Sequence, residues 1–219
     1  MQRSPWSCLL STLLFTGLFS SIASAQLWDE SLQGGGDAPA LPPGQITAGQ
    51  GPLLTISGTI SNPDSDPDVY CIRITDPASF SATTVGSAAV DLSLWLFDSA
   101  MLGVSHDGAI DSSPGTGYQA SLSSAFVPAP GIYFLAVSRG GVDAVSTGGE
   151  IWADLPFVER APDGPGAPGP VVGWIFPGYG APGAYAIQLS GAAYHVPEPA
   201  SLTLITVGMI GLLARRFRR

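Results

Sequence analysis

Glycine and proline occur every few residues along this chain, and their frequency is the strongest constraint on its fold. The 219 residues include 28 glycines and 20 prolines, and neither residue type is well tolerated inside a helix. Between them stand short runs rich in β-branched and aromatic residues, without a sustained helical period. This pattern is typical of short antiparallel strands joined by turns. The sequence therefore predicts an all-β domain.

The runs between the turns place the strands. The run 91–97 is apolar on nearly both faces, so we expect it in the middle of a sheet. Residues 33–52 and 161–170 are so rich in glycine and proline that we expect irregular chain there. Strands are predicted at Leu53–Ile60, Val69–Thr75, Ser79–Thr84, Ala89–Phe97, Leu102–Ser105, Ala120–Phe126, Ile132–Ser138, Ile151–Phe157 and Ala184–Ala192.

The first 25 residues have the layout of a secretory signal peptide. Arg3 supplies a positive start, an apolar stretch follows from Leu9 to Phe19, and Ala23-Ser24-Ala25 is a small-residue cleavage site. We expect cleavage after Ala25, with the mature chain beginning at Gln26. The signal implies passage through the secretion machinery and a body that lies outside the cytoplasm.

The other end combines three features in order. Pro197-Glu198-Pro199 interrupts regular structure, and residues 200–214 then carry no charge. As a helix this run covers about 22 Å at about 1.5 Å per residue, shorter than the roughly 30 Å hydrocarbon core. The basic end favours the cytoplasmic side and acts as a stop for the helix. It consists of Arg215, Arg216, Arg218 and Arg219.

This order of features resembles the PEP-CTERM sorting signal of Gram-negative and related bacteria. The resemblance covers residues 196–219 and implies recognition and cleavage near Pro-Glu-Pro by an exosortase, a membrane protease. It implies a precursor with one pass through the inner membrane, followed by release to the cell surface or the extracellular space. The alternative is a plain C-terminal membrane anchor.

The body between the two end segments is strongly acidic. All eight basic residues of the chain are arginines, and only Arg73, Arg139 and Arg160 lie in the body. The chain has 17 acidic residues, and all of them except Glu198 also lie in the body. Such a surface repels nucleic acid and attracts divalent cations and basic partners. Nucleic-acid binding is therefore excluded.

The small number of cysteines limits the cysteine chemistry that this chain can carry out. Cys8 leaves with the signal peptide, so Cys71 remains without a partner for an intramolecular disulfide. It stands in a strand-like run, where a small buried hydrophobic side chain is the expected role. With Cys71 as the body's one cysteine and two histidines in the chain, the sequence offers no zinc-binding constellation.

The candidate metal site is the run Asp64-Ser65-Asp66-Pro67-Asp68. Alternating carboxylates in a turn can point to one centre, and calcium binds six to eight oxygens. The run is not an EF-hand loop, because Val69 and Thr75 occupy the positions of the required glycine and glutamate. Asp91, Asp98 and Asp107 are candidates to complete the shell. The alternative is that Asn62, Asp64 and Asp66 only shape and solvate a β-turn.

Ser105-His106-Asp107 has the residue types of a catalytic triad but not the expected geometry. Successive side chains of an extended segment point to opposite faces, and triad members normally come from separate segments. We expect a polar turn here and no catalytic residues. A second functional candidate is a sugar-binding surface made by Trp152, Trp174 and Tyr179 in a loop-rich region. Core packing is the alternative role for these aromatic residues.

The body resembles the bacterial pre-peptidase C-terminal domain, a jelly-roll-like β-sandwich. The resemblance rests on 66–72, on Asp91-Leu92-Ser93-Leu94-Trp95-Leu96-Phe97-Asp98 and on Pro130-Gly131-Ile132-Tyr133. It covers residues 50–192 and implies an antiparallel sandwich appended to secreted proteins. The long stretch 142–182 departs from that family's compact spacing.

Together these observations divide the chain into four parts. They are a signal peptide (1–25), an irregular Gly/Pro-rich segment (26–52), a β-sandwich domain (53–194) and a sorting signal with a transmembrane helix (195–219). The expected role is that of a non-enzymatic protein of the cell surface or extracellular matrix. The alternatives are a carbohydrate-binding module that recognises extracellular polysaccharide and a secreted hydrolase.

Overall fold

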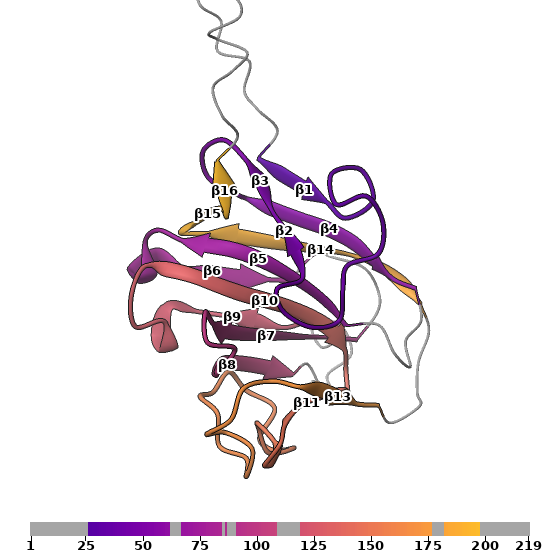
Figure 1. Cartoon of the computed structure of the whole chain (residues 1–219), viewed down its shortest axis with the longest axis vertical. Helices are drawn as coiled ribbons and strands as arrows, with labels where there is room; N and C mark the ends of the chain where they lie inside the picture. The colour runs from indigo at the N-terminus through magenta and orange to yellow at the C-terminus, as the bar shows by residue number, and fades with distance from the viewer. Residues whose placement is uncertain are drawn as a thin grey trace, which may run out of the picture.

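Strands form nearly all the regular structure of the molecule (Figure 1). The computed structural model describes residues 26–61, 67–84, 86, 91–108, 119–176 and 182–197. The described residues also contain two single-turn 3₁₀ helices, η1 (Pro77–Ser79) and η2 (Ser124–Phe126). The all-β prediction is therefore confirmed.

Two large sheets form the sandwich. The first has the order β1 (Leu27–Asp29), β4 (Thr55–Ile60), β14 (Gly183–Ser190), β6 (Ser81–Thr83) and β9 (Ser121–Leu122). The second has the order β15 (Ala192–Tyr194), β5 (Asp68–Ile74), β10 (Gly131–Arg139), β7 (Leu92–Asp98) and β8 (Gly103–Gly108), with β2 (Gln45–Ile46) also paired to β5.

Smaller pairings complete the structure. β11 (Asp143–Ser146) lies between β12 (Gly149–Glu150) and β13 (Gly173–Ile175), and β3 (Ala48–Gly49) pairs with β16 (Val196–Pro197). The long ladders are antiparallel as predicted, but β1–β4, β2–β5 and β3–β16 are parallel. Parallel neighbours need a crossover rather than a hairpin. The chain between β1 and β4 supplies one such crossover, and the segment 26–52 adds the short strands β1, β2 and β3 where irregular chain was expected.

The main hydrophobic core lies between the two large sheets. Side chains alternate between faces along a strand, and Leu92, Leu94 and Leu96 of β7 point into this core. They meet Ile56 and Ile187 of the opposite sheet, and all five side chains are completely buried. Burying one such side chain contributes about 1.5–3 kcal/mol. The core therefore holds the two sheets face to face.

A second core covers the outer face of the second sheet. Trp95 and Phe97 of β7 point to this side and pack against Ile151 and Trp152 from the segment that follows β12. β7 lies between β10 and β8 and is buried on both faces, which confirms its predicted central position. Cys71 lies in the same core at 2% exposure, as predicted, and burial raises the pKa of its thiol to about 11.

The predicted strand Ile151–Phe157 is wrong. Ile151 and Trp152 are buried, but the chain then forms an irregular loop instead of a ladder. Pro156 has no N–H to donate to a neighbouring strand. The carbonyls of Ala153 and Pro156 accept hydrogen bonds from the Arg160 guanidinium instead of from a strand. Only Ile151 and Trp152 of this apolar run are buried, while Leu155 and Phe157 are exposed, so the run does not mark a strand.

The two ends of the described chain lie next to each other (Figure 1). The backbone N–H of Leu54 donates to the carbonyl of Gln26 at 2.8 Å, and the Tyr194 hydroxyl donates to the carbonyl of Leu27 at 3.2 Å. Strand β16 continues from there beside β3. The segments before residue 26 and after residue 197 thus join the sandwich at the same end.

Candidate functional site

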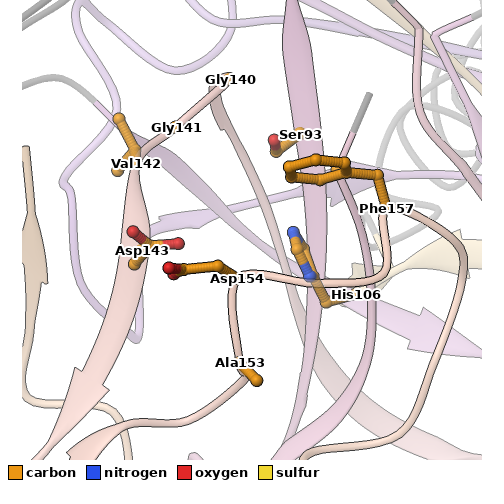
Figure 2. Close-up of a pocket in the computed structure, with 10 residues that line it drawn as sticks. Ser93, His106, Gly140, Gly141, Val142, Asp143, Ala153, Asp154 and Phe157 are labelled. Carbon is orange, nitrogen blue, oxygen red and sulfur yellow. The ribbon is translucent and has the colours of Figure 1, made fainter. Parts of the chain in front are cut away.

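A cavity of about 310 Å³ lies beside strands β7 and β8, where two loops approach the sheet. Figure 2 shows the Asp143 and Asp154 side chains close together on one side, with His106 and Phe157 on the other. We call this space the His106 cavity. It is lined by Ser93, His106, Gly108, Gly140, Gly141, Val142, Asp143, Ala153, Asp154 and Phe157.

His106 is held in place by stacking. Its ring lies on Trp95 with centroids 3.5 Å apart and planes 12° from parallel, and the residue is only 7% exposed. Burial, with a smaller contribution from the Arg160 charge, lowers the His106 pKa to about 3, so the imidazole is neutral. A neutral imidazole offers one donor and one acceptor. Neither ring nitrogen has a hydrogen-bond partner among the described residues.

Three carboxylates gather at the opposite side of this region. Asp143 lies on β11, Glu150 on β12 and Asp154 in the following loop, and one oxygen from each lies within 4.8 Å of the other two. We call these three residues the acidic group. Burial first, then the charges of Glu150 and Asp154, raises the pKa of Asp143 to about 6, against the opposing effect of Arg160.

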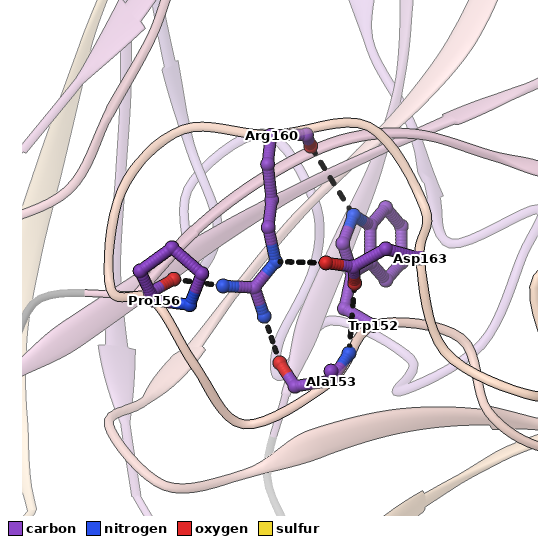
Figure 3. Close-up of polar contacts among 5 residues, drawn as sticks. All are labelled: Trp152, Ala153, Pro156, Arg160 and Asp163. Carbon is purple, nitrogen blue, oxygen red and sulfur yellow. Dashed lines mark hydrogen bonds and ion pairs between the residues drawn. The ribbon is translucent and has the colours of Figure 1, made fainter.

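Arg160 fixes the loop that carries Asp154 and Phe157 (Figure 3). Its guanidinium donates to the carbonyls of Ala153 and Pro156 and forms an ion pair of 3.3 Å with Asp163. The Arg160 backbone N–H and C=O are both bonded to the backbone of His106, at 3.0 and 3.1 Å. The loop is thereby fastened to strand β8 next to the cavity.

The aromatic residues considered for sugar binding belong largely to the core. Trp152 is 2% exposed and packs edge-on against Trp95, with centroids 5.4 Å apart, while its indole N–H donates to the Arg160 carbonyl at 3.2 Å. Trp174 is partly buried and also meets Trp95 edge-on, at 5.6 Å. Tyr179 lies outside the described residues. Core packing therefore explains the two tryptophans, which do not form an exposed platform.

Ser105, His106 and Asp107 lie on strand β8 rather than in the polar turn that was expected. The Ser105 hydroxyl donates to Glu159 at 3.0 Å, while Asp107 accepts from the Ser121 backbone N–H at 2.7 Å. His106 is bonded to neither neighbour and stacks on Trp95 instead. As alternation along a strand predicts, these three residues do not form a proton relay.

Only part of the predicted calcium site can be placed. Asp64 and Asp66 lie outside the described residues. Asp68 is completely buried at the start of β5 and accepts a hydrogen bond of 2.7 Å from the Tyr185 hydroxyl. Asp98 is used elsewhere, because it accepts from two backbone N–H groups in the turn between β7 and β8.

Asp68 has two acidic neighbours that are distant in sequence. One oxygen each of Glu30, Asp37 and Asp68 lies within 4.8 Å of the others, and we call these residues the Glu30 group. Glu30 also accepts from the backbone N–H groups of Ala38 and Thr59, both at 2.8 Å. Sequence spacing alone does not reveal this group, because Glu30 follows β1 of the first sheet while Asp68 begins β5 of the second.

The residues of the two end signals lie almost entirely outside the described part of the chain. This holds for Ala23, Ala25, Glu198, Pro199 and the four terminal arginines. Pro197 is the last described residue and belongs to β16. Among the described residues, no helix is long and apolar enough to cross a membrane.

Comparison with known proteins identifies the tail. Residues 195–219 match the family described as the PEP-CTERM protein-sorting motif. The match agrees with the resemblance seen in residues 196–219 and indicates an exported protein that is anchored in the membrane until an exosortase cleaves it. No curated protein matches the chain.

Proposed function

We propose that this chain is a non-enzymatic protein of the cell surface or extracellular matrix whose acidic β-sandwich is released from the inner membrane by an exosortase. The observation that carries this proposal is the sorting motif at residues 195–219. The secretion machinery exports the body, the C-terminal helix holds the precursor, and cleavage near Pro197-Glu198-Pro199 frees the domain. The resemblance of residues 50–192 to pre-peptidase C-terminal domains supports an accessory role for the sandwich.

The geometry of the domain ends supports this order of events. The backbone of Gln26 and that of Leu54 are hydrogen-bonded, and β16 leaves the sandwich at the same end. While the domain is tethered through residue 197, its opposite end therefore points away from the attachment. The side of the second sheet with the His106 cavity lies at that opposite end (Figure 1). Cutting the tether at Pro197-Glu198-Pro199 leaves both large sheets intact.

A binding role is favoured over hydrolysis by the arrangement of the reactive residue types. Ser105 and Asp107 are bonded to partners other than His106, and Cys71 is buried with a raised thiol pKa. A nucleophile needs an adjacent base to be activated. Carbohydrate binding, the second candidate, would use sites other than Trp152 and Trp174, whose rings pack in the core.

We also propose that calcium binds the Asp-rich turn 64–68 together with the Glu30 group. The observation that favours this is the convergence of Glu30, Asp37 and Asp68 on one point. Calcium accepts six to eight oxygen ligands in a flexible geometry. Asp64 and Asp66, four and two residues before Asp68, are the expected further ligands.

The experiment that tests the sorting proposal is fractionation of cells that express the chain with and without residues 196–219. The chain without residues 196–219 should not be retained in the inner-membrane fraction, and its release should not require cleavage by an exosortase. Replacing Pro197, Glu198 and Pro199 together with alanine should leave uncleaved protein in the inner membrane. The paired Ser201→Ala and Thr203→Ala variant, which keeps the motif and all four terminal arginines, is the control. If the triple variant reaches the surface at the normal level and with the normal size, the tail is an ordinary membrane anchor.

A further inference from the structure

The acidic group is built by the local fold rather than by chance proximity on the surface. Val145 of β11 is paired with Glu150 of β12, and residues two apart on a strand share a face. Asp143 and Glu150 are therefore diagonal neighbours on the same face of the hairpin. Asp154 reaches them from the loop that the Arg160 guanidinium fastens at the carbonyls of Ala153 and Pro156.

The three carboxylates have no counter-charge in direct contact. No hydrogen bond or ion pair joins Asp143, Glu150 or Asp154 to another side chain in the part of the chain that the structure describes. The nearby Arg160 guanidinium is already committed to two carbonyls and to Asp163. Three like charges held within 4.8 Å repel one another, and a bound cation would relieve that repulsion.

A second observation also indicates a ligand at this place. The His106 cavity is lined by Asp143 and Asp154 on one side and by His106 on the other (Figure 2). His106 is only 7% exposed, and both of its ring nitrogens are without partners among the described residues. Buried polar atoms are normally satisfied. A water or a ligand hydroxyl in the cavity would supply the hydrogen bond that this buried imidazole lacks.

We propose that Asp143, Glu150 and Asp154 bind a hard divalent cation, calcium, whose open coordination positions face the His106 cavity. Three carboxylates supply up to six oxygens, and water or a ligand hydroxyl in the cavity completes the shell. His106 hydrogen bonds with that water or hydroxyl. Zinc does not fit, because it favours nitrogen and sulfur ligands in tetrahedral sites and the group that converges here is all oxygen. This site is separate from the Glu30 group and does not depend on the sorting tail.

Calcium titration of the full chain in detergent tests the proposal. The test variant is Asp154→Asn, and the control is Asp76→Asn, which removes an exposed carboxylate that belongs to neither acidic group. Calorimetry should show a calcium site with a Kd of about 0.1–1 mM, the range of extracellular modules. Asp154→Asn should weaken that site at least tenfold, while Asp76→Asn should leave it unchanged.

The melting temperature distinguishes a cation ligand from a merely structural residue. In a chelator, Asp154→Asn should melt at or above the wild type, because it removes repulsion from the unoccupied group. In 5–10 mM calcium, roughly tenfold above that Kd, it should melt below the wild type. The proposal is overturned if the melting temperatures of Asp154→Asn and the wild type differ by the same amount in chelator and in calcium. It is also overturned if Asp154→Asn binds calcium like the wild type, or if Asp76→Asn weakens binding as much as Asp154→Asn does.

Discussion

The raised pKa of Asp143 makes a prediction about stability that can be worked out from the structure. Burial and the charges of Glu150 and Asp154 raise this pKa from 3.8 to about 6. The ionised carboxylate is therefore less favourable in the folded protein than in the unfolded chain. Replacing Asp143 with asparagine, which stays neutral at every pH, should stabilise the protein in a chelator at neutral pH.

The size of this effect follows from the pKa difference. About two pKa units at about 1.36 kcal/mol each correspond to about 3 kcal/mol for a side chain fully removed from water. Asp143 is only half-buried, so solvent screening reduces the expected gain to about 1–1.5 kcal/mol. For a domain of this size, 1 kcal/mol corresponds to about 2–4 °C in Tm. We therefore expect a rise of about 2–6 °C.

The sign of the pH dependence provides the check. Well below pH 3.8 Asp143 is protonated in both states and costs nothing, its cost grows as the pH rises from about 3.8 to about 6, and the cost is complete above pH 6. Thermal unfolding in a chelator should show the full gain of Asp143→Asn at pH 7.5 and almost none at pH 4. An equal gain at both pH values, or a loss at pH 7.5, would refute this reasoning.

Three other predictions concern the ends, the metal and the core. Mass spectrometry of the exported protein should find its N-terminus near Gln26, and an intact Met1 on cytoplasmic protein would contradict the signal peptide. Millimolar calcium should raise Tm more than magnesium does. Part of this rise should persist in Asp154→Asn, and adding Asp66→Ala should remove that remaining part. If sodium chloride at matched ionic strength reproduces the whole rise, or Asp66→Ala changes nothing, the Asp-rich run is only a turn. Leu94→Ala in the completely buried centre of β7 should cost about 2–5 kcal/mol in urea unfolding, and a cost well under about 1 kcal/mol would place Leu94 outside the core.

The sequence predicted the central strands because their apolar pattern reports burial directly. The run 91–97 is apolar on both faces, and β7 is covered by one core on each side. The strand Gly131–Arg139 includes the predicted Ile132–Ser138, and the strand Gly183–Ser190 covers most of the predicted Ala184–Ala192. The same signal misled at Ile151–Phe157, because only Ile151 and Trp152 of that run are buried and the rest forms a loop held by the partly buried Arg160 guanidinium.

The candidate sites were harder to predict because they depend on which strands pair. Asp143, Glu150 and Asp154 are spread over twelve residues with no motif, and only the β11–β12 register places the first two on one face. Glu30 follows β1 of the first sheet and Asp68 begins β5 of the second, so they meet only through the packing of the two sheets, which no local pattern indicates. The C-terminal sorting motif was predictable, since it is a linear motif rather than a site assembled by folding.

The most direct test of the account is the intact mass of the protein in matched cells with and without their exosortase. With the enzyme, the surface form should begin near Gln26, end near Pro197-Glu198-Pro199 and lack all four terminal arginines. Without the enzyme, a form ending at Arg219 should accumulate in the inner-membrane fraction. Surface protein that retains Arg215–Arg219 in both strains would contradict the central claim.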